Sequence, residues 1–231
     1  MTTRLKTLGI LVAVIGIAFL VAGGYAYIRT MDGQRSLTAF SAAQDVQLSY
    51  NADGQLVDRG ETAEADAIMA LLTEDWGYPV NAAEMDPNDP VVNTASEYMY
   101  QMATISYHVL NGTQSITLAE DVTYNGETFL AGTYEVAVDG KYYSQFDRSH
   151  PLDGPTRGLA WSATALGLIG QLGVGAATAS ALQIGLGLAA AMAAIGLTLL
   201  FLGGALVWVT GAESSSVRAP ALRPATGMTG A

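Results

Sequence analysis

Two long apolar segments dominate the pattern of hydrophobic and polar residues along this chain of 231 residues. The longer one, residues 158–210, contains no charged side chain. As a single helix it would be roughly 80 Å long, whereas the hydrocarbon core of a bilayer is about 30 Å thick. Its most apolar part, residues 184–209, predicts a transmembrane helix. Glycine and polar residues dilute residues 158–183, where we expect an apolar helix at the membrane interface or packed on the middle domain.

The first apolar segment, residues 8–28, has the flanks of another transmembrane helix. Arg4 and Lys6 precede it within residues 1–7, and two tyrosines lie near its end. Basic flanks mark the cytoplasmic side of a span, and tyrosines are enriched where a span meets the interface. A cleaved signal peptide is the alternative, but its apolar region usually has only about 7–15 residues. We therefore predict an uncleaved membrane anchor.

Arginines after the second apolar segment predict the topology. Arg218 and Arg223 lie in the cytoplasm if the chain crosses the membrane twice, as the positive-inside bias favours, and outside if residues 158–183 form a third span. We predict two spans in a bacterial plasma membrane, with both termini cytoplasmic. Residues 31–157 would then form an extracytoplasmic domain, and residues 211–231 a disordered tail.

Two amphipathic helices are expected in the middle domain. Residues 61–76 begin with acidic residues, carry Ala65, Ile68 and Leu72 on one side, and end at Gly77. Asp89-Pro90 predicts the start of the second helix. Its two stripes are an apolar one (Val91, Ala95, Tyr98, Met102, Ile105 and Val109) and a polar one opposite (Thr94, Glu97, Gln101, Thr104 and His108).

Short β segments complete the predicted fold. Residues 46–50 and 55–57 flank a glycine-containing turn and indicate a hairpin. Asn125-Gly126 and Asp139-Gly140 are strong turn signals between further segments rich in β-branched and aromatic residues. These segments are residues 115–118, 122–124, 128–130, 134–138 and 142–146. We predict an antiparallel meander, and hence an α+β domain.

Charge is concentrated in the middle domain. All but one of the 21 acidic residues lie between Asp32 and Asp153, and the net charge of the chain is −11. So acidic a surface argues against binding nucleic acid. The chain has no cysteine, which excludes disulfides, thiolate metal sites and a thiol nucleophile. We expect no cofactor.

Small residues recur every seven positions in both apolar segments. Small residues on one face of a membrane helix let a second helix approach closely. We expect these stripes to be packing surfaces, either between the two spans or between neighbouring chains. They consist of Gly9, Gly16 and Gly23 in the first segment and Ala189, Gly196 and Gly203 in the second.

Only two histidines are available for acid–base or metal chemistry. His108 lies on the polar stripe of its helix, where we expect it to be solvated rather than catalytic. His150 lies between Asp147 and Asp153 at spacings of three, an arrangement that could hold a divalent ion. Polar side chains of a loop more commonly bond to their own backbone, which is the simpler interpretation of these residues.

Three sequence strings together resemble a family of bacterial two-span membrane proteins, whose members often bear the automatically transferred label "aromatic ring-opening dioxygenase". They are residues 86–94 (DPNDPVVNT), 99–110 (MYQMATISYHVL) and 146–151 (FDRSHP). The resemblance covers most of the chain. It implies two spans, an intervening outer domain and the plasma membrane, and it carries over no catalytic residues.

Three functions are compatible with these patterns. We favour a non-enzymatic accessory or scaffold component of the cell envelope, whose partners are the lipid bilayer and either further copies of the chain or other membrane subunits. The alternative suggested by the label is a metal-dependent envelope enzyme, in which His108 and His150 would have to act with one carboxylate, because an iron(II) site of this kind needs two histidines and an acid. A sensor of envelope cations is the third.

Overall fold

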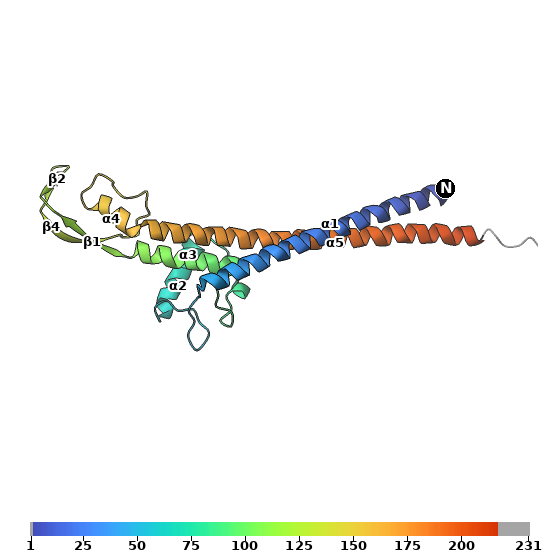
Figure 1. Ribbon diagram of the computed structural model, residues 1–231, viewed down its shortest axis with the longest axis horizontal. Helices are drawn as coiled ribbons and strands as arrows, with labels where there is room; N and C mark the ends of the chain where they lie inside the picture. The colour runs from blue at the N-terminus through green and yellow to red at the C-terminus, as the bar shows by residue number, and fades with distance from the viewer. Residues whose placement is uncertain (1, 217–231) are drawn as a thin grey trace, which may run out of the picture. The chain divides into compact units, whose positions relative to one another are not determined.

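The computed structural model describes residues 2–216 of the chain (Figure 1). It is a mixed α+β structure in which two long apolar helices, packed together, flank a middle region of shorter helices and small antiparallel sheets, which confirms the predicted class. The helices are α1 (Thr2–Gln44), α2 (Thr62–Ala70), the π-helical turn η1 (Leu71–Asp75), the 3₁₀ turn η2 (Ala82–Glu84), α3 (Ala95–Leu110), α4 (Asp153–Ala160) and α5 (Ala163–Ser216). The strands are β1 (Thr113–Leu118), β2 (Val122–Tyr124), β3 (Glu127–Phe129) and β4 (Gly132–Ala137).

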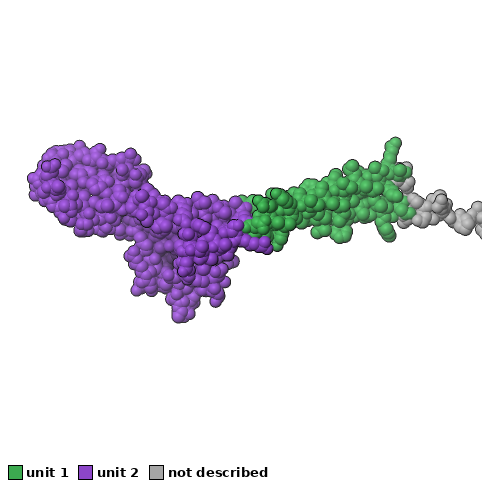
Figure 2. Space-filling view, in the orientation of Figure 1, with its two compact units in different colours: residues 1–32, 183–231 green, residues 33–182 purple. Residues whose placement is uncertain are grey.

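Internal contacts divide the chain into two units (Figure 2). The first unit takes in Met1–Asp32 and Gln183–Ala231, and the second is Gly33–Leu182. Helices α1 and α5 are long and apolar enough to be membrane spans by length and composition. The tail of residues 217–231, with Arg218 and Arg223, lies outside the described residues.

Both long helices extend beyond the apolar segments that predicted them. Helix α1 does not end at residue 28 but continues to Gln44, where Asp45 takes a positive φ of 49°. Helix α5 starts at Ala163, so the predicted boundary between residues 183 and 184 lies inside one helix. Proline is what most often breaks a helix, and neither helix contains one. A change of composition therefore does not mark the end of a helix here.

In the first unit, the small residues of α1 lie directly against those of α5. A Cβ atom added to Gly16 would lie 2.7 Å from the Gly196 carbonyl oxygen, and one added to Gly9 would lie 2.9 Å from that of Gly203. Gly23 faces Ala189 in the same way, with 3.1 Å to its carbonyl oxygen. At these separations no larger side chain fits, so backbone packs on backbone.

We expect Gly16→Leu and Gly203→Leu to separate the two helices. Interhelical contacts in membranes are worth on the order of 1 kcal/mol each, and each kcal/mol lost lowers Tm by about 2–4 °C in a chain of this size. The measurement is Tm and steady-state abundance of the full chain in mild detergent. Gly24→Leu and Gly204→Leu are matched controls, since a Cβ at either position meets nothing within 4 Å. Equal effects in all four variants would mean that the stripes reflect composition alone.

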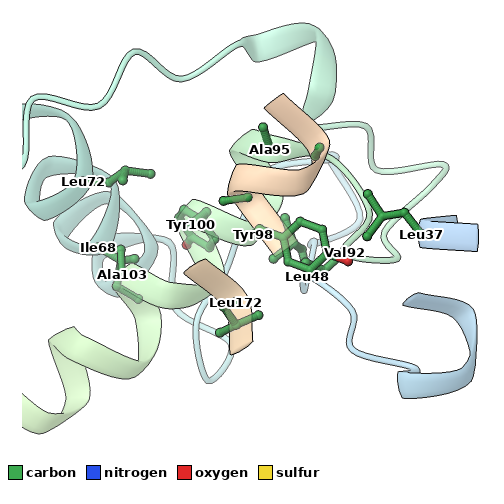
Figure 3. Packing of buried hydrophobic residues seen from close by; sticks show 12 residues of the cluster. Leu37, Leu48, Ile68, Leu72, Val92, Ala95, Tyr98, Tyr100, Ala103 and Leu172 are labelled. Atoms are coloured by element: carbon green, nitrogen blue, oxygen red, sulfur yellow. The ribbon is translucent and has the colours of Figure 1, made fainter. Parts of the chain in front are cut away.

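The core of the second unit is built where α2 and η1, α3, and the first part of α5 meet (Figure 3). Ile68 of α2, Leu72 of η1 and Ala103 of α3 are fully buried, and Leu172 of α5 belongs to the same cluster. Residues 163–182 of α5 are thus packed into the domain, where Leu172 is joined in the core by Ala176 and Ala179. A second cluster around Val138 and Trp161 lies beside it.

Helix α3 begins five residues later than Asp89-Pro90 predicted. Its N-cap is Thr94, whose side chain accepts from the Glu97 N–H, while the Glu97 carboxylate accepts from the Thr94 N–H. This capping box satisfies two backbone donors at once and outcompetes a start at the proline. Pro90 instead accepts a hydrogen bond from the Leu48 N–H through its carbonyl oxygen, at 2.8 Å, in a short extended pairing.

The predicted meander is wrong in its pairing. Strand β1 pairs with β4, and β2 pairs with β3, so the four strands form two nested hairpins. Asn125 and Gly126 both have positive φ in the two-residue loop between β2 and β3, as predicted for this dipeptide. Between the two ladders, three residues (119–121) oppose two (130–131), which interrupts the pairing. The Asp121 carboxylate compensates by accepting from the Ala131 N–H at 2.8 Å.

Residues 142–146 do not form the predicted fifth strand. The Tyr142 carbonyl accepts from the Gln145 N–H at 2.8 Å, and the Gln145 side chain accepts from the Tyr142 N–H, which closes a tight turn. The hairpin predicted over residues 46–57 is present as one bridge between Tyr50 and Leu56.

Candidate functional site

An apolar cavity of about 480 Å³ lies within the second unit. Helices α1, α3 and α5 form its walls, and a short extended segment closes one side. No charged side chain lines it. The lining residues are Leu37, Phe40, Ser41, Gln44, Val46, Val92, Tyr98, Gln101, Ile105, Leu168, Gln171, Leu172, Val174, Gly175 and Thr178. Its size and apolar character are those of small-molecule binding sites, which usually measure about 300–1,000 Å³.

Tyr98 fixes the wall of this cavity. Its hydroxyl and the Ser41 hydroxyl are hydrogen-bonded at 2.6 Å, and both side chains are buried. On the other side, a Cβ added to Gly175 would lie 2.5 Å from the ring of Tyr98. The absence of a side chain at Gly175 therefore lets α5 approach the ring closely, and Tyr98 connects α3 with both long helices.

Uncharged amides and hydroxyls supply the polar groups of the cavity. Gln171 donates to the Gln44 side-chain oxygen at 3.3 Å, linking α5 to the end of α1. Gln101 of α3 also lines the cavity. An apolar body with a few neutral hydrogen-bonding groups suits an uncharged or weakly polar apolar ligand, and it offers no general base or metal ligand.

The place of His108 on the polar stripe predicted a solvated side chain, but the structure shows it in contact with Asp58. Its Nε2 lies 2.9 Å from Asp58 Oδ2, and the two side chains are only 27% and 14% exposed. Asp58 Oδ2 accepts no well-aligned hydrogen bond from the described residues, and the two side chains are an ion pair only with a protonated imidazole. Burial, with a smaller contribution from Asp58, raises the pKa of nearby Tyr100 above its usual range.

Glu97 likewise departs from the predicted polar face, because its side chain is 1% exposed. Its Oε2 accepts from the N–H groups of Asn93 and Thr94 and from the Thr94 hydroxyl. Burial raises the pKa of Glu97, and these hydrogen bonds oppose that shift. The carboxylate is committed to starting α3, which explains its burial without any catalytic role.

The loop residues Asp147, His150 and Asp153 are bound partly to one another's backbone and partly to other residues. His150 Nδ1 accepts from the N–H groups of Leu152 and Asp153 at 3.1 and 3.2 Å. Asp153 pairs with Lys141 at 3.2 Å. Within residues 2–216, no group of three His, Cys, Asp or Glu side chains is arranged to hold a metal ion.

Asp147 is bound by the β2 strand. It accepts from the Tyr124 hydroxyl at 2.6 Å and from the Ser149 N–H, and these hydrogen bonds lower the pKa of its carboxyl group. The His150 ring makes edge contacts with Tyr124 and with Phe129 of β3. The loop is thereby fastened to the β2–β3 hairpin.

No protein-family model matches the chain, and neither curated proteins nor solved structures show a significant similarity to it. The site must therefore be judged from its own geometry. Sequence reasoning placed Tyr98 and Ile105 on one apolar stripe but did not find the cavity. The signal that was available is Gly175, a glycine in the part of α5 whose apolar residues also contribute to the domain core.

We expect His108→Ala to leave the chain folded but to destabilise it, because Asp58 would keep a buried carboxylate without its partner, at a cost of about 1–3 kcal/mol. Asp58→Asn combined with His108→Ala should cost less than the two single changes added together. Chemical unfolding of the full chain in detergent measures all three. Thr104→Ala, one turn away on α3, is the control for helix propensity. Strictly additive costs would show that the 2.9 Å contact contributes nothing.

Proposed function

We propose that this chain is an integral protein of a bacterial plasma membrane that holds an acidic domain outside the cell and acts as a non-enzymatic accessory or scaffold component of the envelope. The observation that supports this most is the surface of the first unit. Large apolar side chains remain exposed along both of its helices, for example Val21 at 67%, Ile184 at 72% and Phe201 at 74%. Contiguous apolar surface of this kind marks contact with a membrane or another protein.

The packing of the two helices favours lipid over a protein partner as what covers that surface. Glycine and alanine bring the two backbones together, with side chains such as Leu20 and Val207 beside them, while many other large residues of both helices remain exposed. In water the large apolar residues would be expected at the contact and the small or polar ones outside. Lipid removes that preference, because its chains are as apolar as leucine, and helices then associate through close packing of small residues.

A scaffold role is supported by what the second unit offers. Its carboxylates with resolved partners serve the fold: Glu97 caps α3, Asp153 pairs with Lys141 and Asp147 fastens a loop. Partners would be further copies of the chain or other membrane subunits, consistent with the resemblance to two-span membrane proteins. Copurification of the intact chain in mild detergent tests this: a chain that is recovered alone and monomeric would contradict it.

The proposed topology places both termini in the cytoplasm and residues 31–157 outside. Because the chain has no cysteine, single introduced cysteines can be labelled in intact cells with a membrane-impermeant maleimide. We expect labelling of Ala52→Cys, and labelling of Thr3→Cys and Ala219→Cys only after the membrane is permeabilised. Both Ala52 and Thr3 are exposed, so access differs only through the membrane. Labelling of Ala219→Cys in intact cells would favour three spans over two.

The enzyme alternative makes a different prediction about metals. A bound metal ion stabilises the folded state by mass action, so a chelator would lower Tm if such a site existed. We expect no change in Tm with EDTA, and no iron or zinc in stoichiometric amount in the purified full chain. Stoichiometric metal that is lost in His108→Ala or His150→Ala would favour a metal-dependent enzyme over the scaffold role.

A further inference from the structure

We propose that the cavity of the second unit is a binding site for one hydrocarbon chain of a bilayer lipid. The inference rests on the proposed membrane location and adds a ligand to it. It concerns only the cavity enclosed by α1, α3 and α5 within Gly33–Leu182.

The chemistry of the walls selects a hydrocarbon. Leu37, Phe40, Ile105, Leu168 and Leu172 supply apolar surface, and no charged group faces the cavity. Phe40 and Leu168 remain 48% and 45% exposed, so apolar surface is uncovered at the cavity. An apolar ligand removes that surface from water, which is the dominant favourable contribution to such binding.

The cavity is held in place rather than formed by loose side chains. The hydrogen bond between Ser41 and Tyr98, at 2.6 Å, fixes the ring that forms one wall. Gly175 brings the α5 backbone against that ring. Because three separate helices share this contact, the space between them does not close by rotation of one side chain.

The order of the chain favours a membrane lipid as the source. The cavity-lining part of α1 starts at Leu37, nine residues after the end of the apolar segment at Ile28. On α5, Thr178 lines the cavity and the span-length apolar segment starts six residues later at Ile184. The helices that contain the two apolar segments therefore continue into the cavity walls, with Arg29, Asp32 and Arg35 between Ile28 and Leu37 on α1. The side-chain amides of Gln44, Gln101 and Gln171 would donate hydrogen bonds to the ester carbonyls of a lipid.

The test uses the full chain reconstituted into phosphatidylcholine vesicles, in which a fraction of the lipid carries a diazirine on one acyl chain. After irradiation, adducts are mapped by peptide mass spectrometry. We expect adducts on residues 37–46 and 168–178 in addition to those on the spans. Adducts confined to the spans would overturn the lipid site and leave the membrane proposal intact. Absence of adducts throughout would overturn both.

A matched pair of variants shows whether the cavity itself is labelled. Leu168→Trp enlarges a side chain that lines the cavity, and Leu166→Trp makes the same change on the same helix at 41% exposure without lining it. We expect Leu168→Trp to reduce adducts on residues 37–46 roughly tenfold, since each methylene excluded from an apolar site weakens binding several-fold. Leu166→Trp should leave them unchanged, and Tm should confirm that both variants fold. Equal reduction by both variants would overturn the proposal.

A second arm distinguishes the source of the chain. A diazirine fatty acid is added to the detergent-solubilised protein in place of the labelled phospholipid. Labelling of the cavity by phospholipid in vesicles supports the proposal. If the free fatty acid labels the cavity and the phospholipid does not, the site takes a soluble fatty acid and the proposed bilayer source is wrong.

Discussion

Close approach of two helix backbones is the interaction on which the first unit depends. Gly16 lies against Gly196 and Gly9 against Gly203, and a single added carbon at any of these positions would meet a backbone atom. Contacts of this kind act only at short range, so they are lost when the two helices move apart. The small residues occupy the closest part of the contact, and large residues such as Val21, Ile184 and Phe201 remain exposed on the outside of the pair.

The second unit also depends on a glycine that lets a helix approach closely, but the glycine contacts a side chain instead of a backbone. Here Gly175 lies against the ring of Tyr98, and the hydroxyl of that ring is hydrogen-bonded to Ser41. Buried polar groups that have hydrogen-bond partners define the packing geometry of this unit, and Glu97 at the start of α3 is one of them. Hydrogen-bonded buried groups fix register and orientation, whereas the apolar residues around them mainly supply burial.

Sequence patterns predicted the elements whose causes are local. The two apolar helices, the helix over α2, and the Asn125-Gly126 turn each follow from composition or from one dipeptide. The start of α3 is also set locally, by the capping box of Thr94 and Glu97, a signal that the Asp89-Pro90 prediction overlooked. The strand pairing was wrong because distant residues decide it: β1 pairs with β4 across an inner hairpin. The cavity escaped prediction for the same reason, because its walls come from three helices that are far apart in the sequence.

The contact between Gly175 and Tyr98 also limits how this sequence can change over evolutionary time. A Cβ at residue 175 would meet three ring atoms of Tyr98 within 2.8 Å, so alanine there requires a smaller side chain on α3. Reducing Tyr98 first would remove the hydrogen bond to Ser41 and leave a buried hydroxyl without its partner. Each single step is therefore unfavourable while the combined change is tolerable, so residues 41, 98 and 175 should vary together among descendants of this chain.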